Sequence, residues 1–281
     1  MTTAFVLSGG GSLGSVQAGM LLALAERNIE PELLVGTSVG AVNAAWLAGH
    51  SGLDGARTLG RVWRSVRRSD VFPARPVLGL LGFAGRRDHL VSADPLRALL
   101  RRHLTFDRLE DAPVPLHVVA TDITTGEEVV ISTGDAVDAV AASSAIPGVF
   151  PPVTLGDRVL VDGGVSSNVP IARAVERGAT TVYVLPTGYA CALRAAPASA
   201  LGVAMQALTL LLQQRLAADI ANFGRDVDLR VLPPLCPLEV SPIDFSHSAE
   251  LIERSHELSA AWLERADWSS TVEVLALHRH P

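Results

Sequence analysis

A serine between two glycines, in Gly36-Thr37-Ser38-Val39-Gly40, is the feature of this sequence with the most direct chemical meaning. The apolar run 33–35 before it predicts a buried strand, and the small residues after it predict a helix lying close to a sheet. A serine in such a sharp turn holds its hydroxyl clear of the backbone, at the positive end of the helix dipole. Ser38 is therefore a candidate nucleophile, and Gly36 and Gly40 would leave room for the turn. The same pattern also suits a plain helix cap.

A glycine-rich loop, Gly9-Gly10-Gly11-Ser12-Leu13-Gly14, follows a strand predicted over residues 4–8 and precedes a predicted helix. Backbone N–H groups at such a helix start can bind a pyrophosphate or an oxyanion. The glycine spacing fits a dinucleotide-binding fingerprint, which requires an acidic residue at the end of the next strand. That strand ends in Gly36-Thr37-Ser38 instead. An oxyanion site is therefore favoured, and nucleotide binding through Gly9 to Gly14 stays open as an alternative.

A third motif, Asp162-Gly163-Gly164, ends a strand predicted over residues 158–161. If this strand is parallel to the one before Ser38, the carboxylate projects at the same sheet edge as the serine hydroxyl. Asp-Gly is also a favoured turn pair, which gives the motif a purely structural alternative. None of the eight histidines stands at a strand end followed by a loop, as the base of a triad would. His247 is the least unsuitable of them for a Ser-His-Asp triad.

In this order the three motifs resemble those of the bacterial patatin-like phospholipases. In that family the first glycine loop forms the oxyanion hole, Gly-x-Ser-x-Gly carries the nucleophile, and Asp-Gly-Gly carries the base. The likeness extends to Ser144-Ala145-Ile146-Pro147 and Asn168-Val169-Pro170, and it covers roughly residues 4–185. Many members have Arg or Lys where this sequence has Leu13, a departure that leaves backbone donation by Gly10 and Gly11 intact.

The resemblance implies a two-residue mechanism. Asp162 would accept the Ser38 proton directly while the hydroxyl attacks an ester carbonyl, and would later return it to the leaving alcohol. Because a free aspartate with a pKa of about 3.9 is a weak base, the site must partly bury it and stabilise the oxyanion strongly. The implied substrates are phospholipid or lysophospholipid esters, and no cofactor or metal ion is expected. A general carboxylesterase with a Ser-His-Asp triad and an inactive regulatory relative remain alternatives.

The elements that would position these motifs alternate along the chain. Strands are predicted over residues 4–8, 33–35, 116–121, 128–132, 158–161, 181–185 and 229–232, and helices over 53–66, 135–144, 170–178, 200–223 and 248–265, among others. The alternation predicts an α/β fold, and with the resemblance a three-layer α/β/α sandwich with a mostly parallel central sheet. We expect a catalytic domain over residues 4–185, with residues 186–281 as a C-terminal extension of helix and strand packed on the same domain.

Composition narrows the protein class. The 281 residues are 48% hydrophobic, enough for one sizeable core, and the net charge of −6 argues against a nucleic-acid partner. No apolar stretch reaches the length of a membrane span, and the first residues show no secretory signal. Cys191 and Cys236 have no metal-ligand or redox spacing and are interpreted as lone cysteines of a reducing compartment. We therefore expect a cytoplasmic location.

The stretch Asp70 to Asp88 is apolar, contains glycines and is bracketed by arginines. Residues 64–88 hold six arginines against two aspartates. Such a segment is typical of a surface that meets anionic lipid, so we predict peripheral membrane contact through residues 70–88. The alternative is a surface loop whose leucines pack against the core.

Overall fold

A computed structural model describes residues 2–73, 88–188 and 227–265 except 237 and 239, together with a few single positions between 189 and 226. Its strands are β1 (Thr3–Leu7), β2 (Leu33–Thr37), β3 (Leu116–Asp122), β4 (Glu128–Ile131), β5 (Val153–Leu155), β6 (Arg158–Asp162), β7 (Thr181–Leu185) and β8 (Asp228–Val231). The helices are α1 (Gly14–Ala25), α2 (Val39–Gly49), α3 (Gly52–Ser65), α4 (Arg68–Val71), α6 (Asp94–His103), α7 (Ala136–Ser143), α8 (Ile171–Val175) and α10 (Ser248–Leu263). Three short 3-10 turns are η1 (Gly11–Leu13), η2 (Leu109–Asp111) and η3 (Gly163–Val165).

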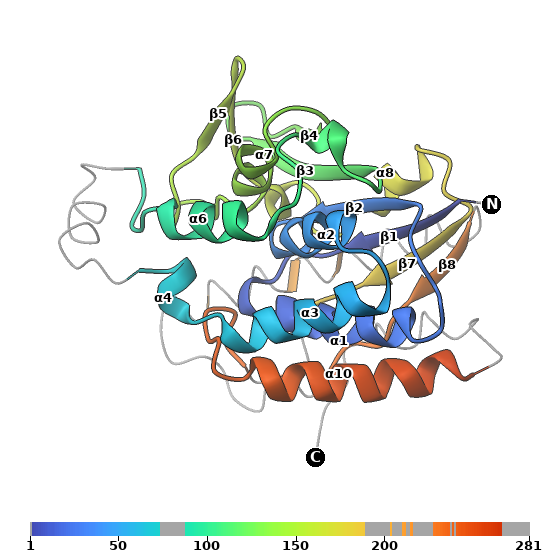
Figure 1. Cartoon of the computed structure of the whole chain (residues 1–281). Helices are drawn as coiled ribbons and strands as arrows, with labels where there is room; N and C mark the ends of the chain where they lie inside the picture. Colours follow the sequence, from blue (N-terminus) through green and yellow to red (C-terminus); the bar gives the residue numbers. More distant parts are fainter. Residues whose placement is uncertain are drawn as a thin grey trace.

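The described strands form one sheet in the order β5-β6-β3-β2-β1-β7-β8, with β4 also pairing with β3 (Figure 1). The strands β3, β2, β1, β7 and β8 run parallel to their neighbours in that order. The pairings β3–β4, β3–β6 and β5–β6 are antiparallel. The carboxyl ends of β1 and β2, which lead into the glycine loop and into Ser38, therefore lie side by side at one edge of the sheet.

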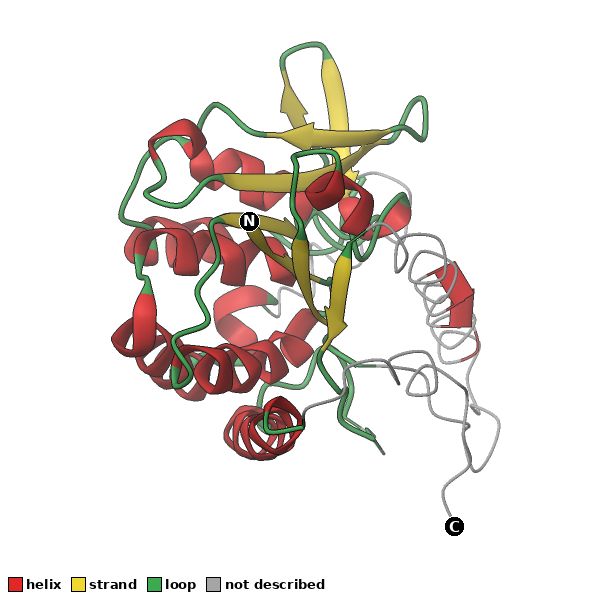
Figure 2. Ribbon diagram, turned by 90° about the vertical axis from the view of Figure 1, so that its right-hand side faces the viewer, coloured by secondary structure: helices red, strands yellow, loops and turns green. Residues whose placement is uncertain are grey.

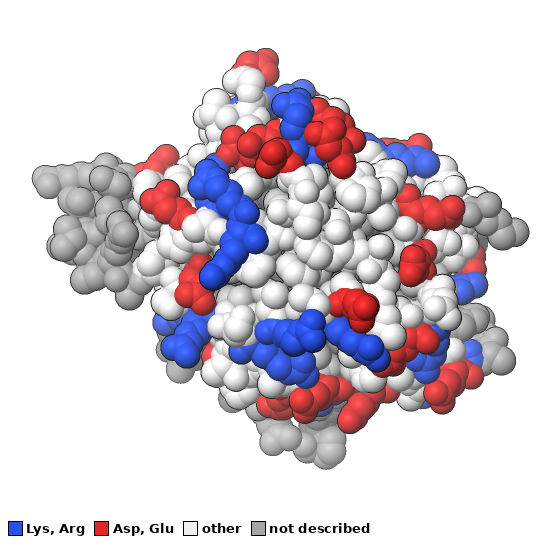
Figure 3. Space-filling view, viewed as in Figure 1, with Lys and Arg blue, Asp and Glu red and all other residues white. Residues whose placement is uncertain are grey.

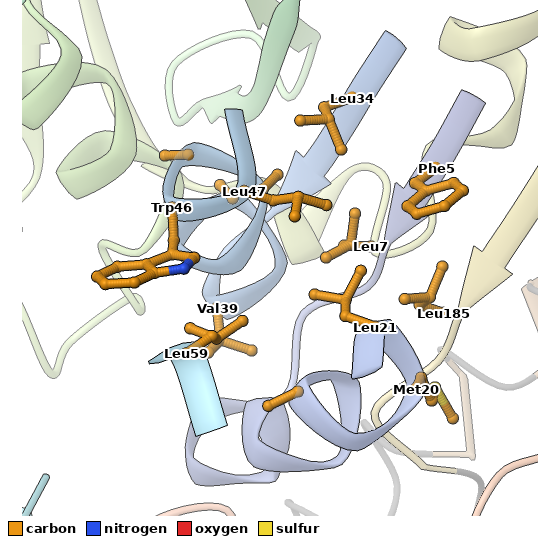
Figure 4. Packing of buried hydrophobic residues seen from close by; sticks show 14 of the residues in the cluster. Phe5, Leu7, Met20, Leu21, Leu34, Val39, Trp46, Leu47, Leu59 and Leu185 are labelled. Atoms are coloured by element: carbon orange, nitrogen blue, oxygen red, sulfur yellow. The ribbon is translucent and has the colours of Figure 1, made fainter. Parts of the chain in front are cut away.

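Both faces of the sheet are covered by helices, as Figure 2 shows. Because strand residues alternate between faces, Phe5 and Leu7 pack in a large cluster with residues of α1, α2, α3 and α10, part of which is drawn in Figure 4. Ala4 and Val6 pack on the opposite face, with residues of α8. The predicted three-layer α/β/α sandwich with a mostly parallel sheet is confirmed.

The C-terminal part of the chain packs on this same sheet. β8 pairs with the edge of β7, and α10 lies along α1. The two helices approach closely at Gly19, where an added Cβ would lie 2.1 Å from Ser255 Oγ. Cys236 is disulfide-bonded, so the expectation of a lone cysteine at this position is wrong.

Most of the predicted strands are present within a residue or two, but β5 was not predicted. The predicted helix 170–178 is shorter, since α8 covers only Ile171–Val175. Residues 74–87, which make up most of the predicted membrane-contacting stretch, lie outside the described residues, as does the predicted helix 200–223 apart from single positions. In the part of the chain that the structure describes, each helix is too short or too polar to cross a membrane.

Candidate active site

Ser38 occupies the turn between β2 and α2. Its backbone has φ 55° and ψ −126°, a conformation that residues with a side chain rarely adopt. The turn closes only because two glycines flank it. A Cβ at Gly40 would lie 2.2 Å from the Leu7 carbonyl oxygen, and one at Gly36 would lie 2.6 Å from the Gly40 carbonyl oxygen. The sequence therefore folds here into a strained, crowded turn, in which Ser38 is buried and only 7% exposed.

Ser38 Oγ donates a hydrogen bond of 2.6 Å to Asp162 Oδ2. The structure thus brings together the two residues that the sequence singled out, but not through parallel strands. β6 is antiparallel to β3, with Asp162 opposite Ala120, while β2 pairs with β3 through Thr37 opposite Val119. β6 therefore runs in the direction opposite to β2 and β3. Its last residue, Asp162, lies level with the end of β2, after which Ser38 follows. The parallel arrangement that was considered for these two strands does not occur, but Ser38 and Asp162 are brought together all the same.

Burial raises the pKa of Asp162 to about 6. Only 7% of the residue is exposed, and loss of water disfavours the charged carboxylate. The hydrogen bond from Ser38 and a second one of 2.8 Å, from the Gly164 N–H to Oδ1, act in the opposite direction but are outweighed. The carboxylate is therefore a stronger base than a solvated aspartate while still being ionised near neutral pH.

Three further hydrogen bonds hold the serine turn. The Ser38 N–H donates to Ser143 Oγ at 2.8 Å, and Ser143 Oγ donates to the Val119 carbonyl at 2.5 Å. On the other side, Thr37 Oγ1 donates to the Ser167 carbonyl at 2.9 Å. The serine backbone is thereby tied to α7, to β3 and to the loop that follows Asp162.

The glycine loop passes directly beside Ser38. A Cβ at Gly9 would lie 3.1 Å from Ser38 Cβ and 2.5 Å from Asn168 Oδ1. The Gly9 N–H donates to the Asn168 carbonyl, and the Gly14 N–H donates to the carbonyls of Gly11 and Ser12. The N–H groups of Gly10 and Gly11 donate to none of the described residues. These two amides are therefore the ones in the loop left for an external acceptor.

The loop is held from the C-terminal part of the chain. The Ser12 N–H donates to the Pro242 carbonyl at 2.7 Å, and Gly11, with φ +60°, passes so close to it that an added Cβ would lie 2.3 Å from that oxygen. Thr187 Oγ1 donates to the Gly9 carbonyl at 2.6 Å. Sequence reasoning missed Pro242 and Thr187, since nothing local marks them.

A chain of buried side-chain amides connects this loop to α2 and α3. Trp63 Nε1 donates to Asn43 Oδ1 at 2.9 Å, and Asn43 Nδ2 donates to Gln17 Oε1 at 2.8 Å. Gln17 Nε2 then donates to the carbonyls of Ser8 and Leu185, both at 2.9 Å. Sequence reasoning also missed these residues. A signal was present, because Gln17 and Asn43 are single amides in otherwise apolar helices, where a buried polar group requires partners.

An apolar pocket with about 820 Å³ of empty space, including its part open to solvent, begins at Ser38. Its wall comes from α2, α3, α4, α6 and the segments that connect them to other elements, and consists of Gly11, Ser38, Val39, Val42, Asn43, Trp46, Leu59, Val62, Trp63, Val66, Val71, Phe72, Leu96, Leu99, Leu100, His103, Leu104, Ser144, Ile146, Phe150 and Phe245. One side of this pocket is formed by α6. Phe72 also belongs to the wall and stacks on Phe150 with ring centroids 5.2 Å apart.

Two other residues singled out in the sequence, His247 and Leu13, do not belong to the Ser38–Asp162 pair. His247 is exposed at the start of α10, where its ring nitrogens face Asp244 and Glu250 at 3.7 and 3.3 Å. Leu13, which departs from the motif, is buried in the main core cluster. Among the described residues, no group of three or more His, Cys, Asp or Glu side chains could hold a metal ion.

The family model for patatin-like phospholipase matches residues 5–175. The chain belongs to the patatin-like phospholipase family. This confirms the resemblance seen in the three motifs.

Several curated proteins share this patatin-like region. An uncharacterized NTE family protein of Mycobacterium tuberculosis is 30% identical over 169 residues, which are 60% of this chain and 44% of that protein. The patatin-like phospholipase domain-containing protein 7 of Mus musculus is 28% identical over 192 residues, 66% of this chain and 13% of that protein. The lysophospholipase NTE1 of Mycosarcoma maydis is 27% identical over 189 residues, 67% of this chain and 10% of that protein. The chain thus spans less than half the length of these relatives. Among solved structures, ExoU of Pseudomonas aeruginosa aligns with a TM-score of 0.49 and 17% identity over 94% of this chain and 52% of that one.

Proposed function

We propose that this protein is a serine lipid acyl hydrolase that cleaves carboxylic ester bonds of phospholipids or lysophospholipids. The observation that carries the proposal is the 2.6 Å hydrogen bond from Ser38 to a buried aspartate, beside an apolar pocket that begins at the same serine. Membership of the patatin-like phospholipase family supports it. An ester with an apolar acyl chain matches both parts, since the chain fits the pocket and the ester carbonyl then lies at the hydroxyl.

In the proposed mechanism Asp162 accepts the proton of Ser38 Oγ while that oxygen attacks the ester carbonyl. Collapse of the tetrahedral intermediate releases the alcohol, which takes the proton back from Asp162, and leaves an acyl-serine. Water then attacks the acyl-serine with Asp162 again as the base, which releases the fatty acid and restores Ser38. Burial of Asp162 supports this role, because the raised pKa makes the carboxylate a better proton acceptor.

The glycine loop supplies the proposed oxyanion hole. The N–H groups of Gly10 and Gly11 are the proposed donors, whereas Gly9 and Gly14, whose amides have partners, give the loop its shape. Preorganised backbone donors of this kind are typically worth about 3–4 kcal/mol each in the transition state.

An assay of the purified chain on acyl esters, lysophospholipids and phospholipids tests the proposal. We expect ester hydrolysis together with stoichiometric labelling of Ser38 by a fluorophosphonate. Binding of NAD, NADP or ATP without such labelling would instead support the nucleotide-binding alternative. Loss of turnover on replacing His247 by alanine would support the Ser-His-Asp alternative; we expect no such loss, since His247 is engaged with Asp244 and Glu250 on the surface.

The activity should follow the ionisation of Asp162. The proposed base acts only when deprotonated, so kcat/KM for a small soluble ester should be constant well above pH 6. Below that pH it should fall about ten-fold for each unit. A pH series on an uncharged ester, with circular dichroism at each pH to show that the fold persists, measures this. A profile that stays flat two units below pH 6 would contradict Asp162 as the base.

We also propose peripheral contact with anionic lipid through residues 70–88. Figure 3 shows basic side chains over α6 and α3, the helices on either side of the pocket, with an uncharged area between them. The helix α6 carries Arg101 and Arg102, and both are exposed. Each basic side chain near an anionic surface contributes on the order of 1 kcal/mol, so binding should weaken with salt.

Replacing Leu80, Leu81 and Phe83 together by serine should weaken vesicle binding and hydrolysis of aggregated lipid, while a small soluble ester is still cleaved. Sedimentation with anionic vesicles at low and high salt measures the binding. Leu258→Ser, at an exposed apolar position on α10, is the matched control and should bind as the unmodified chain does. Parallel loss of both activities would assign the stretch to the acyl pocket or the core instead.

A further inference from the structure

One side of α2, the helix that begins after Ser38, lines the pocket together with Ser38 itself. The α2 residues that line it are Val39, Val42, Asn43 and Trp46, which are spaced so that they fall on the same side of a helix. Trp46 stands eight residues beyond Ser38, which corresponds to about 12 Å along the helix axis. This side of the helix thus runs from the hydroxyl to the indole of Trp46.

Trp46 is fixed at this far position. The residue is buried, and its Nε1 donates to the Gly55 carbonyl at 3.1 Å. One face of the indole stacks on His50, with ring centroids 4.0 Å apart and an angle of 8° between the planes, and His50 is not part of the pocket wall. The ring of His103, which does line the pocket, lies 5.7 Å from the indole. The indole is therefore backed by a second ring and cannot move away easily.

The side chains that line this end of the pocket are uncharged. Burial, and next the neighbouring Arg102 and His50, lower the pKa of His103, so that its ring is neutral at neutral pH. Leu99, Leu100 and Leu104 complete the wall around it. An apolar, uncharged end suits the terminal methyl of an acyl chain and not a phosphate or another charged head group.

We infer that Trp46, with His103 opposite, ends the acyl pocket and limits the length of the acyl chain that can be placed with its carbonyl at Ser38. The inference rests on the proposed function and names the specificity-determining residue of that site. Once a chain has filled a closed apolar pocket, one further methylene costs roughly ten-fold or more in kcat/KM. Shortening the side chain at position 46 removes the stop and extends the pocket.

The test compares the chain-length preference of Trp46→Leu with that of the unmodified protein, on p-nitrophenyl esters from butyrate to palmitate. We expect the ratio of kcat/KM for the longest ester to that for the best ester to rise at least ten-fold, with the optimum moved to a longer chain. Leu47→Ala is the matched control. It removes packing from the next residue of α2, which belongs to the core and not to the pocket wall, and it should leave the optimum unchanged.

An unchanged optimum in Trp46→Leu, or an equal change in Leu47→Ala, would overturn the inference. If Trp46→Leu does not fold, Trp46→Phe keeps a ring against His50 while shortening the side chain, and the same rise in the ratio, smaller in size, is expected. Labelling of Ser38 by alkyl fluorophosphonates of increasing length measures the pocket without hydrolysis. Length-dependent labelling in a protein that hydrolyses none of the esters would refute the proposed function but not the pocket stop.

Discussion

Ser38→Ala and Asp162→Asn are each expected to abolish nearly all ester hydrolysis, by a factor on the order of ten thousand or more, and the double variant should be little worse than either. The reason is the single hydrogen bond between them. Without the hydroxyl there is no nucleophile, and without the carboxylate no other described residue hydrogen-bonds to Ser38 Oγ to take its proton. Initial rates of the three variants on one soluble ester measure the effect. Losses that multiply in the double variant would contradict a shared function.

Stability measurements separate this loss from misfolding. The folded pKa of Asp162, about 6, lies above its ordinary value of 3.8, so the stability linked to its protonation is present at low pH and is lost as the pH rises through about 6. A difference of roughly two pKa units corresponds to about 3 kcal/mol at neutral pH. An asparagine side chain in this place cannot ionise. The Asp162→Asn protein should therefore unfold at the same temperature as the unmodified chain or higher at neutral pH, while inactive.

Gly10→Ala should reduce kcat by about a hundred-fold while changing KM little. A Cβ at this position would lie 2.2 Å from Thr187 Oγ1, and Thr187 holds the loop through the Gly9 carbonyl. The loop must shift to accommodate the methyl group, which displaces the two proposed donors. Their hydrogen bonds gain most strength when the carbonyl oxygen becomes an oxyanion, so turnover suffers more than binding.

Gly60→Ala provides the control for this substitution. Gly60 lies within α3, where an added Cβ would meet only the far end of the Arg64 side chain at 3.5 Å, and alanine is favoured over glycine in a helix. This variant should keep full activity. A Gly10→Ala protein with raised KM and unchanged kcat would show that the loop contacts only the ground state of the substrate.

Local sequence signals were sufficient for every described strand except β5, and for the two turns around Ser38 and Asp162. These elements depend mainly on residues close to them in the sequence. Apolar runs predict buried strands, and the glycines at 36 and 40 are required by contacts within a few residues or with the adjacent strand. The direction of β6 was not predictable in this way, because a strand's orientation depends on how the preceding chain enters the sheet. The short strand β5, which brings β6 in antiparallel, gave too few residues for a periodic pattern.

The rest of the site depends on contacts between distant parts of the chain. Pro242 supports the glycine loop and Phe245 lines the pocket, yet both lie beyond the region that carries the family motifs. The apolar faces of α3 and α6 have the periodicity of ordinary core helices, and only the fold shows that they face each other across empty space. A periodic pattern predicts which side of a helix is buried, but not whether protein atoms or a ligand fill the space against it.

Two features of the serine turn weaken the fold at the same place. Ser38 adopts a positive φ that is typically unfavourable by roughly 1–3 kcal/mol, and Asp162 carries a buried charge at neutral pH. Glycine at 38 or an uncharged residue at 162 would relieve either one. Under the proposed function the same two features are required for the reaction, so the substitutions that stabilise this site most are expected to be the ones that inactivate it.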